Sequence, residues 1–206
     1  MQYFKSLILI FVSVTMLQDY AKAQYTIQLL NGKQKQIINY ELRGGDLVYK
    51  KPNDKKGRHH KMDRYGVFSV LDSTGKEEII YNPIDTLDDL APDRMRTFIN
   101  GEKYAMKNYR TPFGIKAESF LVGAGAGLLT IYGTPIPFLN AAIVQRFTPD
   151  VPRGLPDEPA EIENIDFQEG FKYKARKHKI EQSLIWGGIG FGIGFATFAL
   201  IIPQVQ

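Results

Sequence analysis

Cysteine is absent from the 206-residue chain. Without a thiol, the protein forms no disulfide, has no cysteine nucleophile and offers no cysteine ligand to a metal. Histidine is rare too, and the adjacent pair His59 and His60 lies among lysines and arginines. Because those cations repel a metal ion, we expect no metal site and no cofactor.

A large excess of charge of one sign is also missing. The formal net charge is +4, and the chain without residues 1–23 carries 24 basic and 21 acidic side chains. This balance argues against a nucleic-acid partner. The sequence has no G-x-S-x-G, no H-E-x-x-H and no P-loop, and its G-x-G patterns lie in apolar runs rather than after a strand. We therefore expect a non-enzymatic protein with no catalytic residue.

Residues 1–23 have the three parts of a secretory signal peptide. Lys5 precedes the apolar run Leu7–Leu17, which is too short to span a membrane, and Ala21-Lys22-Ala23 follows it. We expect cleavage before Gln24, with an uncleaved anchor as the alternative. The mature protein is then exported from the cytoplasm.

Residues 24–89 contain the short alternating runs typical of β-strands. Turn signals separate these runs at Asn31-Gly32, Gly44-Gly45 and Thr74-Gly75. We expect five antiparallel strands that close into an SH3-like or Sm-like barrel, or that remain an open meander. The predicted fold class is α+β, with this small periplasmic β head followed by amphipathic helices and two Gly-rich membrane helices.

Residues 90–116 predict an amphipathic helix at a membrane interface, because Pro92 suits a first helical turn and apolar residues follow at helical spacing. Residues 117–147 predict the first membrane segment, with 27 consecutive uncharged residues that are broken at Gly133–Pro137. This segment either crosses the membrane, which is the topology we favour, or forms a re-entrant hairpin whose tip is buried in protein.

Residues 148–181 predict an acidic, proline-rich linker followed by a basic amphipathic helix, and residues 182–203 a second membrane helix. The run Gly187–Phe195 alternates glycine with Ile or Phe as a strand would, but the alternation stops directly after it. A helix, at 100° per residue, places these glycines in two opposite grooves that neighbouring helices can approach closely. We expect helix packing at seven glycines: Gly123, Gly125, Gly127, Gly188, Gly190, Gly192 and Gly194.

The stretch Phe98–Lys107 resembles Phe167–Arg176 when the chain is shifted by 69 residues. The two stretches either belong to a duplicated unit, as membrane proteins often show, or only share a composition. Both carry aromatic and basic side chains suited to lipid headgroups. The expected membrane-interface residues are Tyr104, Tyr109, Lys116, Tyr173, Lys174, Arg176, Lys177 and Lys179.

A basic loop in the head is a candidate contact for an anionic envelope polymer or lipid headgroup. A solvated loop without a partner is the alternative. The residues concerned are Lys55, Lys56, Arg58, His59, His60 and Lys61.

The hairpin Asp72–Tyr81, the stretch Met95–Ala105, the break Thr134–Pro137 and the basic run Gly170–Lys179 together resemble exported envelope proteins of unknown function that abound in Bacteroidetes. The resemblance implies the cell envelope of a Gram-negative bacterium, in the inner or the outer membrane, and assigns no functional residue.

These patterns predict a structural or accessory subunit of a membrane assembly, held by glycine-mediated helix packing. Its partners would be membrane lipid and either other envelope subunits or further copies of itself. The alternative is a small homo-oligomeric pore or transport subunit.

Overall fold

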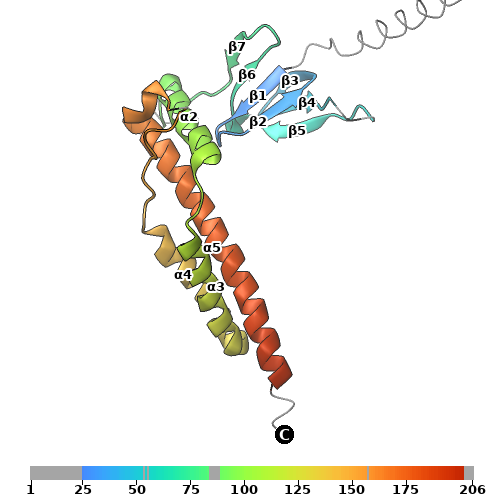
Figure 1. Cartoon of the computed structure of the whole chain (residues 1–206). Coiled ribbons are helices and arrows are strands. Elements are labelled where there is room, and N and C mark those ends of the chain that lie inside the picture. The colour runs from blue at the N-terminus through green and yellow to red at the C-terminus, as the bar shows by residue number, and fades with distance from the viewer. Residues whose placement is uncertain (1–24, 53, 55, 84–88, 157, 202–206) are drawn as a thin grey trace, which may run out of the picture. The chain divides into compact units, whose positions relative to one another are not determined.

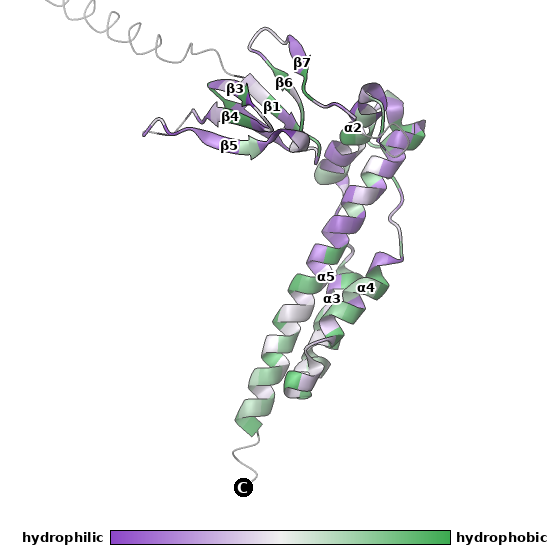
Figure 2. Ribbon diagram, turned by 180° about the vertical axis from the view of Figure 1, so that it is seen from behind, coloured by the Kyte–Doolittle hydropathy of each residue, from purple (hydrophilic) through white to green (hydrophobic). Residues whose placement is uncertain are grey.

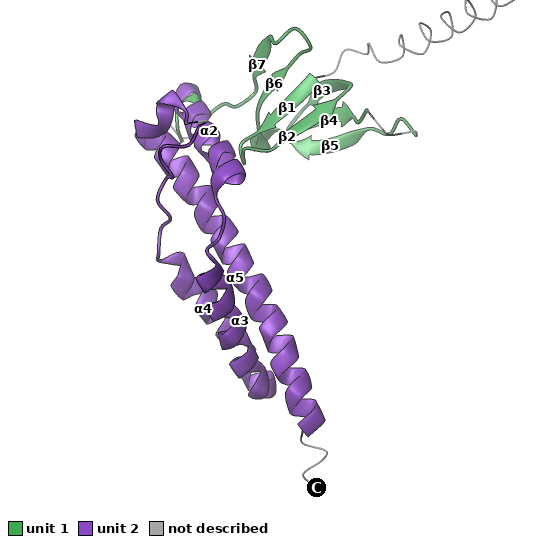
Figure 3. Cartoon of the chain, in the orientation of Figure 1, with its two compact units in different colours: residues 1–92 green, residues 93–206 purple. Residues whose placement is uncertain are grey.

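The computed structural model of the chain describes residues 25–52, 54, 56–83, 89–156 and 158–201. The predicted signal peptide, residues 1–23, lies outside these residues, and so does Lys55. The chain divides into two compact units, residues 1–92 and 93–206 (Figure 3). Strands come first and helices follow, which confirms the α+β class (Figure 1).

The N-terminal unit has seven strands in two antiparallel sheets, with the orders β2-β1-β6-β7 and β3-β4-β5. The positive φ angles of Gly32, Gly44 and Gly75 turn three of the hairpins, a conformation that glycine adopts without strain. The strands are β1 (Tyr25–Leu29), β2 (Gln34–Ile37), β3 (Asn39–Arg43), β4 (Asp46–Lys50), β5 (His60–Asp63), β6 (Val67–Leu71) and β7 (Glu77–Ile79).

This unit is not the five-stranded barrel or single meander that we expected. The predicted strand over residues 33–42 is interrupted at Ile38, so β2 pairs with β1 whereas β3 pairs with β4. An unexpected strand, β5, arises from the basic loop and pairs with β4. The described strands form two separate ladders, and no ladder joins them into a closed barrel.

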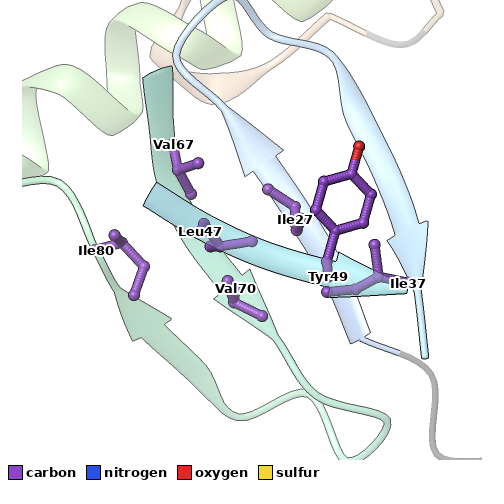
Figure 4. Close-up of a cluster of buried hydrophobic side chains, with 7 residues drawn as sticks. All are labelled: Ile27, Ile37, Leu47, Tyr49, Val67, Val70 and Ile80. Atoms are coloured by element: carbon purple, nitrogen blue, oxygen red, sulfur yellow. The ribbon is translucent and has the colours of Figure 1, made fainter. Parts of the chain in front are cut away.

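Apolar side chains, rather than shared backbone hydrogen bonds, hold the two sheets together (Figure 4). Ile27 and Ile37 come from one sheet and Leu47 and Tyr49 from the other, and all four are buried in one cluster. The cluster is completed by Val67, Val70 and Ile80.

The helical unit contains four α-helices and two short 3₁₀ helices, with a further 3₁₀ turn, η2 (Arg64–Gly66), in the N-terminal unit. The helices are α2 (Pro92–Asn108), α3 (Phe113–Leu128), η3 (Thr130–Gly133), α4 (Ile136–Gln145), η4 (Ala160–Glu163) and α5 (Ile165–Ile201).

Two features of this unit differ from the sequence prediction. The basic helix and the second membrane helix are one continuous helix, α5, of 37 residues. The segment 117–147 is divided between α3 and α4, because Pro135 and Pro137 supply no amide hydrogen to continue α3. Among the described helices, α5 alone is long and apolar enough to cross a membrane, so the expectation of two spanning helices is wrong.

Candidate functional site

α3 and α5 run parallel with their backbones in contact. Gly123 packs against Gly187, where a Cβ atom on Gly123 would lie 2.9 Å from the Cα atom of Gly187. Gly190 packs in the same way against the carbonyl group of Phe120. Because the opposing atoms belong to the backbone, a side chain at Gly123 or Gly190 would force the helices apart.

The contact repeats one turn further along. Gly127 packs against the carbonyl of Phe191, and Gly194 packs against the carbonyl of Ala124. In every pair, a glycine of one helix meets the carbonyl three residues before the matching glycine of the other. The two helices are therefore related locally by a two-fold exchange, with matching positions 67 residues apart.

α2 meets the beginning of α5 by the same reciprocal contact. Gly101 packs against the carbonyl of Phe167, and Gly170 packs against the carbonyl of Phe98. These matching positions are 69 residues apart, which is the shift that relates the two similar stretches of sequence. The change from 69 to 67 occurs at the break between α2 and α3. The sequence similarity thus coincides with a repeated helix contact.

Three of the seven predicted packing glycines lie outside these contacts. A Cβ atom on Gly125, Gly188 or Gly192 would have no neighbouring atom within 4 Å. Gly123, Gly127, Gly190 and Gly194 instead face the contact between α3 and α5. The second groove predicted on α5 is therefore open.

Sequence reasoning did not single out three further packing glycines, namely Gly101, Gly170 and Gly187. The first two were already aligned by the 69-residue shift, which was the signal that could have identified them. Gly187 adjoins Pro137 of α4 as well as Gly123 of α3, with 3.3 Å between its virtual Cβ atom and the Cβ atom of Pro137.

A buried polar cluster that the sequence did not reveal links α3, α4 and α5. The hydroxyl groups of Ser119 and Ser183 are 2.8 Å apart, and Asn140 donates its side-chain amide to the Ser119 oxygen at 3.2 Å. Both serines are completely buried, and Asn140 is nearly so. Because each side chain has a partner in the cluster, these polar groups are satisfied without water.

Two predicted membrane-interface residues are buried in protein, so they cannot face headgroups. Tyr104 packs against Phe167 and Phe171, and its hydroxyl donates to the Pro152 carbonyl at 3.3 Å. Lys179 is 2% exposed and donates to the Phe147 carbonyl. Their long or aromatic side chains fill the space between helices instead.

The other predicted interface residues are at least partly accessible, with Tyr173 and Lys177 exposed. Tyr109 packs edge-on against Phe171 and His178. Arg176 donates to the Thr148 hydroxyl at 3.1 Å. Lys116 lies in α3, and Lys174 lies in α5.

Asp54 organises the basic loop of the N-terminal unit. Its carboxylate accepts from the Lys56 amide at 3.0 Å and from Arg58 at 3.2 Å, and lies 3.2 Å from the His60 ring nitrogen. The Lys56 amide contributes most to lowering the pKa of this carboxyl, and the His60 and Arg58 side chains add to it. His60 also stacks on Tyr49, whereas Lys56, Arg58, His59 and Lys61 are exposed.

Two acidic side chains lie at the contact between α2 and α5. Arg94 forms a two-point ion pair with Asp166, with distances of 2.7 and 3.0 Å. Glu102 is buried, and among the described residues one of its carboxylate oxygens has no hydrogen-bond partner. Burial raises the pKa of the Glu102 carboxyl, an effect that Lys174 and Lys177 oppose.

The apolar half of the helical unit is largely uncovered. Figure 2 shows α5 hydrophilic along its first half and hydrophobic along its second. Most of the apolar window of α5 is exposed. Large exposed apolar side chains also lie on α3, η3 and α4, among them Leu121, Ile131, Phe138, Leu139 and Ile143. A surface of this kind fits lipid better than water.

The described residues contain no group of three or more acidic or histidine side chains that could hold a metal ion. Comparison of the chain with protein-family models, curated proteins and solved structures finds no match. Its function is therefore inferred from its own residues.

Proposed function

We propose that the chain is a non-enzymatic membrane protein of the cell envelope, and that it acts as a structural or accessory subunit of a membrane assembly. The observation that carries this proposal is the exposed apolar surface of α5, α3 and α4. Burying such a surface in lipid removes it from water, and each fully buried Leu, Ile or Phe side chain contributes about 1.5–3 kcal/mol.

The distribution of charge supports a membrane as the surrounding medium. Residues 119–145 and residues 182–206 carry no Asp, Glu, Lys or Arg. The basic residues of α5, from Lys172 to Lys179, all precede its apolar part. Cations at one end of an apolar helix suit the boundary between headgroups and hydrocarbon.

The internal packing favours an anchoring role over a pore. In the bundle, the polar side chains of Ser119, Ser183 and Asn140 bond to one another rather than lining a channel. The open glycines Gly188 and Gly192 leave one side of α5 free for another helix, which fits membership of a larger assembly. The predicted signal peptide and the resemblance to exported envelope proteins support the envelope location.

Fractionation and mild-detergent purification test the proposal. We expect the protein to stay in the membrane pellet after washes with high salt and alkaline carbonate, and to co-purify with other envelope subunits. Recovery of the intact protein from the soluble fraction would refute the membrane role. A discrete homo-oligomer that conducts solutes in liposomes would replace the accessory role with the pore.

A further inference from the structure

The path of α3 and α4 beside α5 defines which parts of the helical unit share one level. Ser119 pairs with Ser183, Gly123 with Gly187 and Gly127 with Phe191, so α3 descends in parallel with α5. The chain then reverses at η3. Asn140 returns to the level of Ser119, and Phe147, directly after α4, reaches Lys179.

Charged residues therefore lie at the same end of all three helices. Lys116 and Glu118 are in the first turns of α3, Arg146 follows α4, and Glu181 is the last charged residue of α5. Beyond this level, neither the α3–α4 hairpin nor α5 carries a charge. Both ends of the hairpin are thus at the charged end, and its tip is at the uncharged end.

The helices of the hairpin are too short to cross a bilayer. α3 has 16 residues and α4 has 10, which correspond to about 24 and about 15 Å, against a hydrocarbon core of about 30 Å. Lys179 and Phe191, the level that Gly127 reaches, are separated along α5 by about 18 Å. From Lys179 to Ile201, α5 extends about 33 Å, enough to cross.

The tip of the hairpin supplies its own hydrogen bonds. The Leu129 amide donates to Ala126, and both the amide and the hydroxyl of Thr134 donate to the Ile131 carbonyl, at 3.0, 3.3 and 2.8 Å. Pro135 and Pro137 have no amide hydrogen to satisfy. Such a turn loses few bonds to water on entering an apolar medium. The exposed Ile131 and Tyr132 at the tip contradict the expectation of a tip buried in protein.

We infer that the α3–α4 hairpin enters and leaves the bilayer on one side, with lipid acyl chains around it, and that α5 alone crosses. This inference rests on the proposed membrane role. It replaces the two-crossing topology favoured by the sequence, and it places α2 and the acidic linker, residues 148–164, on the same side of the membrane.

Single-cysteine variants test this topology, because the chain has no native cysteine. Met106→Cys reports on the chain before the hairpin, Pro156→Cys on the linker, Tyr132→Cys on the tip and Leu200→Cys on the end of α5. Each full-length variant is reconstituted in phospholipid vesicles under conditions in which Met106→Cys labels predominantly from one side. The cysteine-free chain is the control for background labelling.

We expect a membrane-impermeant maleimide to label Pro156→Cys to the same extent as Met106→Cys. A fluorophore on Tyr132→Cys or Leu200→Cys should be quenched several-fold more by brominated lipid than one on Pro156→Cys. Labelling of Pro156→Cys and Met106→Cys from opposite sides would overturn the inference. So would a water-exposed Tyr132→Cys beside a lipid-quenched Leu200→Cys. If Leu200→Cys is not quenched either, the membrane role itself fails.

Discussion

Gly123 of α3 and Gly187 of α5 lie backbone against backbone, without a side chain between them. The hydroxyl pair Ser119 and Ser183 lies one turn earlier, at the same register. Small residues at successive turns therefore set the distance between the two helices, and they leave no room for a larger side chain.

Substituting Gly123 with leucine should destabilise the helical unit. The new side chain would meet the backbone of α5, and relieving such an overlap costs about 1–3 kcal/mol or more. Denaturant titration in detergent micelles, followed by far-UV circular dichroism, measures the free energy of unfolding. Gly125→Leu is the matched control, because it places the same residue on the same helix in open space. Equal losses in the two variants would show that the close contact is not the cause.

Ser183→Ala should weaken the buried polar cluster. Ser119 would lose its partner at 2.8 Å and keep only the donation from Asn140. We expect a loss of about 0.5–1.5 kcal/mol in the free energy of unfolding, which is the usual range for such bonds between helices. The control is Thr197→Ala, whose hydroxyl bonds only to the Ile193 carbonyl of its own helix. An unchanged midpoint for Ser183→Ala would contradict a stabilising role.

Stability should fall with rising pH because of Glu102. Its pKa is raised in the folded state from an ordinary value of 4.5, so the unfolded chain ionises first as pH increases. The stabilisation is complete below the unfolded pKa and is lost as pH rises through the folded pKa. Glu102→Gln should remove this part of the pH dependence, whereas the exposed Glu169→Gln should retain it. Thermal unfolding between pH 4 and pH 8 checks the difference, and parallel curves for the two variants would count against it.

Arg94→Lys should loosen the attachment of α2 to α5. Lysine cannot reproduce the two-point contact that the guanidinium makes with the largely buried Asp166 carboxylate. We expect a loss of about 1 kcal/mol in unfolding free energy. Arg43→Lys is the control, because its pair with Glu41 is exposed on both sides and should contribute little. A smaller loss for Arg94→Lys than for Arg43→Lys would refute the assignment.

The turn glycines and the helical periodicity account for what could be predicted locally. The hairpins at Gly32, Gly44 and Gly75 follow from residues that favour positive φ, and these signals act over a few residues. The strand β5 was missed because His60–Asp63 lacks apolar alternation and owes its form to pairing with β4. Such pairing depends on a neighbour that is distant in sequence.

The angular positions of the glycines along α5 follow from the sequence by itself, because a helix rotates by 100° per residue. The sequence also determined where charge ends and apolar helix begins. Only the tertiary structure decided that Gly190 and Gly194 face α3 whereas Gly188 and Gly192 remain open, because helix rotation is set by the partner surface. It likewise decided that α3 and α4 fold back as a hairpin, since the reversal depends on Gly133 packing against Ala126 and on Asn140 reaching Ser119.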